Sequence, residues 1–280
     1  MEIKASDVKA LRERTGAGMM DCKKALQEAG GDFAKAEKHL KELGLAAAAK
    51  RIGRATNEGR VFTKLTDSRA GMIELACETD FVARNTDFIA IGEQIVADVT
   101  ARNLKQPDAA VEDLVQKART TIRENIALRR IVTIDAAADE TLVEYVHGEG
   151  RIGVIVKAKA EKPEAFSNPA VKEFIFNTAL HIAAFNPMYL TKDKVDPAYL
   201  KEQEEIFTVQ AANLGKPANV LAGIVKGKLS KHLAEICLYD QPFVKDDKRT
   251  VAQVMNDLGK EIGSKITITD YLYYRVGEDL

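Results

Sequence analysis

Cysteine and histidine are scarce in this sequence, and their scarcity argues against two kinds of protein. The 280 residues include three cysteines, Cys22, Cys77 and Cys237, and four histidines. A small, odd and dispersed set of cysteines argues against a disulfide framework, and so few histidines argue against a Cys/His metal site. We therefore expect a protein of the reducing cytoplasm that holds no metal and no cofactor.

Long apolar runs and an imbalance of charge are also missing. No stretch approaches the roughly 18 apolar residues of a membrane span. Residues 1–7 have neither the layout of a secretory signal nor that of a transit peptide. The formal net charge is -1, so no overall field draws the chain to nucleic acid or to a membrane. We expect no direct contact with either.

Catalytic signatures are absent too. Gly223 to Leu229 resembles a phosphate-binding loop, but its glycine spacing is one residue short and Leu229 stands where a Mg²⁺-binding Ser or Thr belongs. Glu74, Glu78 and Asp80 form a carboxylate cluster that no nearby histidine or nucleophile accompanies. We interpret the cluster as a solvated sheet edge and expect a binding protein rather than an enzyme. An enzyme that uses these carboxylates remains the weaker alternative.

Residues 1–54 predict a separate unit of three helices. Ser6 is placed to cap the first helix, the second is expected over 19–29, and the third over 33–43 with Gly44 as its stop. Such a bundle is near the lower size limit for folding alone.

Beyond a polar linker, the chain predicts two α+β subdomains, over 55–138 and 139–280. The expected strands cover 61–65, 72–77, 128–134, 141–147, 151–159 and 235–238, and the expected helices cover 86–99, 109–124 and 169–185. Hairpins interleaved with helices indicate α+β layers built on antiparallel sheets. A weak repeat, in which residues 235–238 and a following helix echo residues 74–77 and theirs, would be explained by two related subdomains.

Residues 196–234 have a different pattern from the rest of the second subdomain. Leu200, Phe207 and Leu214 recur every seven residues, and the Gly-Lys-Pro segment 215–217 interrupts the pattern. This predicts two antiparallel helices joined by a short turn, a projecting helical hairpin. The sequence leaves open whether the hairpin packs only on itself or also joins two copies of the chain in a homodimer.

Two stretches suit contact with a partner better than packing. In the first, Met19 and Met20 begin a helix, where adjacent positions diverge by about 100°; either one is exposed, as in adaptable protein interfaces, or a loose core absorbs both. In the second, Phe81 follows a strand end and a polar turn. Phe81 either packs beneath the sheet or forms an exposed aromatic wedge beside Asp80. His147, at a strand end beside glycines, is the one histidine placed like a contact residue.

These stretches resemble the elongation factor Ts family. The run from Arg12 to Leu26, RERTGAGMMDCKKAL, is similar to the family's N-terminal signature, and Thr79-Asp80-Phe81-Val82 is similar to its second signature. Further similar segments follow in the family's order at 124–126, 129–130, 147–154, 181–184, 215–217 and 241–244.

The resemblance implies a ubiquitin-associated-like N-terminal domain, two related α+β subdomains and the helical hairpin. It also implies a partner, the GTPase elongation factor Tu, whose GDP must be released before GTP can load, and it implies no active site in this chain. The contact residues that it implies are Arg12, Met19, Met20, Lys23, Thr79, Asp80, Phe81, Val82 and His147. A rival interpretation is an adaptor whose N-terminal bundle recognises ubiquitin-like or chaperone partners.

Overall fold

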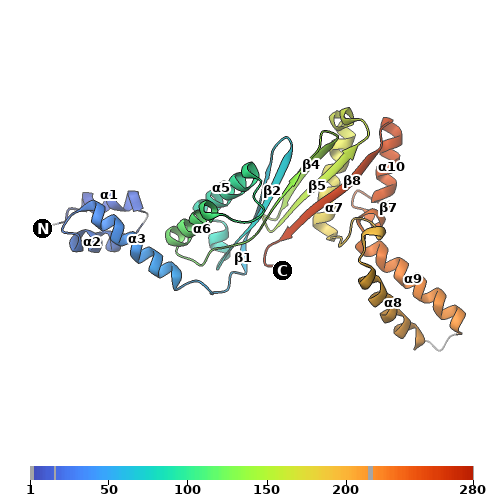
Figure 1. The fold of residues 1–280 in the computed structure, drawn as a ribbon, viewed down its shortest axis with the longest axis horizontal. Helices are drawn as coiled ribbons and strands as arrows, with labels where there is room; N and C mark the ends of the chain where they lie inside the picture. The colour runs from blue at the N-terminus through green and yellow to red at the C-terminus, as the bar shows by residue number, and fades with distance from the viewer. Residues whose placement is uncertain (1–2, 16, 214–216, 280) are drawn as a thin grey trace.

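The computed structural model describes residues 3–15, 17–213 and 217–279 of an elongated molecule (Figure 1). A helical bundle lies at one end, two sheets with their helices fill the middle, and a helical hairpin projects near the other end (Figure 1). The α+β class predicted from the sequence is therefore confirmed.

The N-terminal bundle consists of three helices around its own small core. They are α1 (Ala5–Thr15), α2 (Met19–Glu28) and α3 (Phe33–Ala49). The buried face of each helix follows from the 3.6-residue period and is lined by Val8, Leu11, Cys22, Ala25, Leu26, Ala36 and Leu40.

Two predicted helix ends in this bundle are wrong. Ser6 lies inside α1, and the carbonyl of Lys4 accepts the first helical hydrogen bonds instead. Gly44 does not stop α3, because the alanines that follow are the best helix formers and outweigh the roughly 1 kcal/mol that one glycine costs. Gly44 also faces α6, where a Cβ would lie 3.5 Å from Thr120 Cγ2.

The first sheet has the antiparallel order β1-β2-β3 and carries helices on one face. Its elements are β1 (Glu58–Leu65), β2 (Arg69–Cys77), α4 (Asp80–Ala83), α5 (Thr86–Arg102), α6 (Ala109–Ile122) and β3 (Ala127–Asp135). Alternate residues of β1 and β2, including Phe62, Ile73 and Leu75, pack against Phe88 and Ile95 of α5.

The second sheet repeats this layout with the antiparallel order β4-β5-β8. Its elements are β4 (Glu140–His147), β5 (Ile152–Ala160), η1 (Pro163–Ser167), α7 (Pro169–Phe185), β6 (Pro242–Phe243), β7 (Asp246–Thr250), α10 (Val251–Ile262) and β8 (Ile266–Arg275). Val154 and Val156 of β5 pack against α7 and α10.

The two sheets pack against each other through their remaining faces. Ile155, which alternates with Val154 and Val156, joins Val61 and Met72 in a cluster between the sheets. At Gly153 a Cβ would lie 2.4 Å from Val61 Cγ1, so the close approach of the sheets requires glycine there. The layers therefore run helix, sheet, sheet, helix.

The helical hairpin consists of α8 (Pro197–Ala212) and α9 (Ala218–Ile236), as the heptad pattern predicts, with η2 (Lys192–Lys194) before it and η3 (Leu238–Asp240) after it. The predicted turn at 215–217 lies largely outside the described residues. The strand predicted at 235–238 is wrong, because α9 runs on to Ile236 and the amide of Cys237 donates to the carbonyl of Leu233. Residues 74–77 and 235–238 are thus not structural equivalents. The boundaries after residues 54 and 138 stay a prediction.

Candidate partner-binding surface

The segment after β2 presents Phe81 to solvent. Thr79 caps the one-turn helix α4, and its hydroxyl accepts a hydrogen bond from the amide of Val82 at 3.3 Å. Val82 and Ala83 pack toward the core of the first sheet, so Phe81, which precedes them on the turn, is directed outward and is 82% exposed. The interpretation that Phe81 packs beneath the sheet is wrong, and Phe81 is an exposed ring beside Asp80.

The buried side chain of Cys77, the last residue of β2, is hydrogen-bonded to the segment that leads into this turn. Burial is the main cause that raises the pKa of the Cys77 thiol to about 12, and the negative charge of Glu124 is the second. The group therefore stays a thiol, and its Sγ donates to the carbonyl of Thr79 at 3.2 Å.

The carboxylates considered for acid–base chemistry do not converge. Glu74 is fully buried, accepts hydrogen bonds from Arg129 and Arg130, and is no solvated edge, because β2 is the central strand of its sheet. Glu78 instead accepts from the amide of Asn125 at 2.6 Å.

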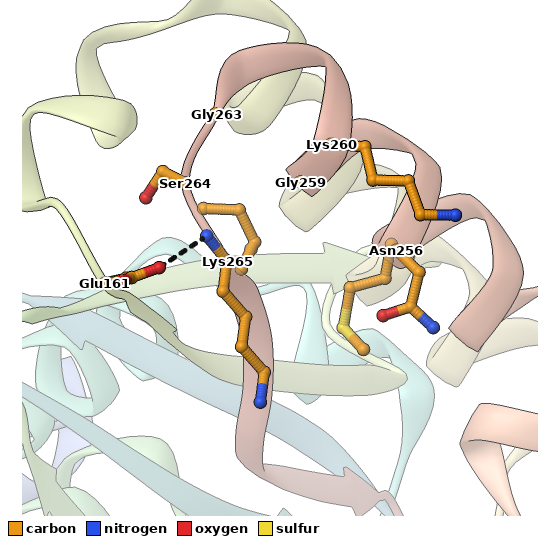
Figure 2. Close-up of a pocket in the computed structure, with 9 residues that line it drawn as sticks. Glu161, Asn256, Gly259, Lys260, Gly263, Ser264 and Lys265 are labelled. Atoms are coloured by element: carbon orange, nitrogen blue, oxygen red, sulfur yellow. Dashed lines mark hydrogen bonds between the residues drawn. The ribbon is translucent and has the colours of Figure 1, made fainter.

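Two hollows of the molecule lie away from these carboxylates. Figure 2 shows the first, of about 440 Å³, between α10 and the start of β8, with the Lys265 amide donating to Glu161 at 3.5 Å. The second, of about 400 Å³, lies between α7, α10 and the β6–β7 hairpin. Neither hollow is lined by Glu74, Glu78 or Asp80. Across residues 3–15, 17–213 and 217–279, no cluster of three or more His, Cys, Asp and Glu side chains is arranged to hold a metal ion.

The first turn of α2 exposes both adjacent methionines. Met19 is 43% and Met20 is 73% exposed, because the opposite face of α2, with Cys22, fills the small core. The interpretation that a loose core absorbs both methionines is therefore wrong. Lys23 and Arg12 are exposed as well.

His147 ends the edge strand β4 and is exposed. Tyr145 Oη lies within hydrogen-bond distance, 2.9 Å, of His147 Nδ1 and orients the ring. His147 is followed by a turn through Gly148, Glu149 and Gly150, with φ values of 59°, 55° and 92°.

Sequence reasoning missed two ion pairs beside these regions, one between the Phe81 turn and the turn after His147 and one between α2 and the end of α6. Arg84, just after α4, pairs with Glu149 beside His147 at 3.3 Å. Arg123, at the end of α6, pairs with Asp21 of α2 at 3.0 Å. No local pattern signals such pairs, because Asp21 and Arg123 are 102 residues apart in the chain.

Comparison with known proteins decides the family. The model of the family described as "Elongation factor TS" matches residues 78–278. Elongation factor Ts of Treponema denticola is 50% identical over 277 residues, with 99% of each chain covered. The chain belongs to the elongation factor Ts family. It is thus a translation elongation factor, and the resemblance drawn from its motifs is confirmed.

Other members of the elongation factor Ts family match over the same length. The protein of Treponema pallidum is 43% identical over 288 residues, covering 99% of each chain. That of Borrelia hermsii is 44% identical over 278 residues, covering 99% of this chain and all of the other.

Within the ranges that the structure describes, no helix combines the length and apolar character needed to cross a membrane.

Proposed function

We propose that this protein is the guanine-nucleotide exchange factor of elongation factor Tu, which binds the GDP form of that GTPase and promotes release of GDP. The observation that carries the proposal is the exposure of Phe81, 82%, on the capped turn α4 beside Asp80. An exposed ring on a fixed turn suits insertion into a partner, because little conformational freedom is lost on binding.

The mechanism that we propose is a competition for the Mg²⁺ and phosphate site of the partner. Mg²⁺ bridges the nucleotide phosphates and the ligands of a GTPase, so displacement of those ligands by Asp80 and Phe81 weakens GDP binding. By linkage, this protein and GDP oppose each other's binding by the same free energy. Such a factor needs no nucleotide site of its own.

We assign the remaining contact residues to the same partner. The N-terminal domain, residues 1–54, would hold the nucleotide-binding domain through Arg12, Met19, Met20 and Lys23, whose mixed apolar and basic surface suits an adaptable interface. The core subdomains would present residues 79–82 and, on a separate contact, His147. Cytoplasmic action fits the three cysteines, which are buried and not joined in disulfides. A homodimer through the helical hairpin stays a prediction.

The test is release of a fluorescent GDP analogue from elongation factor Tu. Unchanged protein should accelerate release strongly, and Phe81→Ala should lose about tenfold or more of that acceleration, as loss of a central aromatic contact does. The matched control is Phe185→Ala, which removes a 54% exposed ring from α7, outside the proposed contacts, and should leave release unchanged.

Two results would change the conclusion. If Phe81→Ala accelerates GDP release as strongly as the unchanged protein, contacts other than Phe81 must weaken GDP binding. No acceleration by the folded, unchanged protein would refute the exchange function and leave the adaptor interpretation ahead.

A further inference from the structure

Glu124 reaches from the connection between α6 and β3 to the turn that carries Phe81. Its Oε2 accepts hydrogen bonds from the amides of Glu78, at 3.0 Å, and Thr79, at 3.1 Å. Its Oε1 accepts from the Thr79 hydroxyl at 2.7 Å. One carboxylate therefore satisfies three donors of the segment that precedes α4.

The Thr79 hydroxyl links this carboxylate to the helical turn itself. A hydroxyl has one hydrogen to donate, and here Glu124 takes it. The lone pairs of Thr79 Oγ1 are then directed away from Glu124 and accept from the Val82 amide at 3.3 Å. The cap of α4 thus depends on Glu124.

A turn as short as α4 needs such support. It has four residues, too few for a helix that is stable by its own hydrogen bonds, and its side-chain packing comes from Val82 and Ala83. Without Glu124, two part-buried amides would lack an acceptor, and the segment would rearrange toward water to satisfy them.

The same connection is also tied to the neighbouring linker and to α2. The carboxylate of Glu78 accepts a hydrogen bond from the backbone amide of Asn125 at 2.6 Å. The side-chain Nδ2 of Asn125 donates to the carbonyl of Arg54 at 2.8 Å. Arg123 pairs with Asp21 on α2. Residues 123–125 thus hold both the turn of Phe81 and the helix of Met19 and Met20.

We infer that Glu124 is a positioning residue for nucleotide exchange: its carboxylate fixes α4 in the conformation that presents Phe81 to the partner. This inference rests on the exchange function proposed above. Glu124 makes no partner contact in this role, so its effect is expressed through Phe81.

The experiment is a double-mutant cycle on Glu124→Gln and Phe81→Ala, read by release of the fluorescent GDP analogue. Glutamine keeps the size of the side chain but replaces one acceptor oxygen by an amide donor. We expect the maximal release rate to fall about tenfold, the consequence of unsatisfied donors at the turn. The concentration of this protein at half-maximal rate should change less than threefold or so, because the α2 surface is intact. The double variant should be no slower than Phe81→Ala alone.

Controls separate positioning from general damage. Glu112→Gln alters an exposed carboxylate on α6 and should release GDP at the unchanged rate. Thr79→Val removes the hydroxyl and keeps the side-chain shape, so it tests the same contact if Glu124→Gln folds poorly. Because Thr79 is itself assigned to the partner surface, Thr79→Val is read in the same cycle: it should slow release, and Thr79→Val with Phe81→Ala should be no slower than Phe81→Ala alone.

Each remaining outcome is decisive. Full activity of both Glu124→Gln and Thr79→Val, or additive losses in the double variant, would overturn the inference and leave the exchange function standing. No acceleration by the unchanged protein would overturn the exchange function and this inference with it.

Discussion

Glu74→Gln should cause one of the largest losses of stability available to a single conservative change in this chain. The carboxylate is fully buried on the central strand β2. It accepts hydrogen bonds from Arg129 Nη1 at 2.9 Å, Arg130 Nε at 2.7 Å and the Gly277 amide at 2.9 Å. It therefore joins the first sheet to the segment that follows β8.

The magnitude follows from what glutamine leaves behind. The side chains of Arg129 and Arg130 are 21% and 16% exposed, so both lose a largely desolvated counter-charge. Removal of one partner from a buried pair costs about 3–5 kcal/mol. The lower end applies here, about 3 kcal/mol, because Arg130 keeps its 3.1 Å ion pair with Glu278.

The assay is urea unfolding followed by tyrosine fluorescence. The chain has no tryptophan, and its seven tyrosines all lie at residue 145 or beyond. Tyr274 itself stacks under the Arg130 guanidinium, at 3.9 Å. With a slope of about 2 kcal/mol per molar urea, the midpoint should fall by more than about 1 M.

The control is Glu149→Gln. Glu149 pairs with Arg84 at the surface, where the side chain of Glu149 is 71% exposed and that of Arg84 is 68% exposed. It should cost no more than about 0.5 kcal/mol. A loss below about 1 kcal/mol for Glu74→Gln would show that the two arginines find other partners, and would refute the reasoning.

Two further predictions concern a buried histidine and two glycines. Burial lowers the pKa of His181, although its Nε2 donates to Gln241 Oε1 at 2.8 Å. Below pH 6.5 the unfolded chain therefore binds a proton that the native state resists, and the free energy of unfolding falls by up to about 1.4 kcal/mol per pH unit. In urea unfolding at pH 7.5 and 5.5, His181→Gln should lose less stability than the unchanged protein; an equal loss would contradict the assignment. Gly92→Ala places a Cβ 2.2 Å from Phe62 Cζ, and this overpacking should cost about 1–3 kcal/mol. Gly223→Ala, whose Cβ would meet no described atom within 4 Å, should instead stabilise α9 by about 0.5–1 kcal/mol; thermal unfolding followed by circular dichroism distinguishes the two, and equal melting temperatures would refute the comparison.

Elements with strong signals at both ends were predictable from the sequence. Helix α7 is the clearest case, because Asn168 caps it, Pro169 occupies its first position, and Asn186 ends it with φ 42°. These signals depend on interactions within a few residues. The two signature motifs were equally readable, and together with the further similar segments they indicated the family.

Predictions failed where contacts with a distant part of the chain decide the secondary structure or the burial of a residue. Gly44 did not stop α3, which continues against α6. Where a strand was expected at 235–238, α9 runs on to Ile236 and η3 begins at Leu238. Glu74 looked like an edge carboxylate, yet β3 and the segment after β8 bury it. A residue pattern gives the faces of a strand but not what will cover each face.

The sequence by itself thus determined the fold class, most elements, the family and the residues that resemble its contact motifs, because periodicity, caps and motif order are local properties. Only the tertiary structure decided that Phe81 is exposed, that both methionines of α2 are exposed, and that Glu124 accepts hydrogen bonds from the segment that leads into α4. Exposure and support depend on which surfaces meet in three dimensions. Those surfaces come from segments far apart in the chain: Asp21 and Arg123 are 102 residues apart, and Glu74 and Gly277 are 203 residues apart.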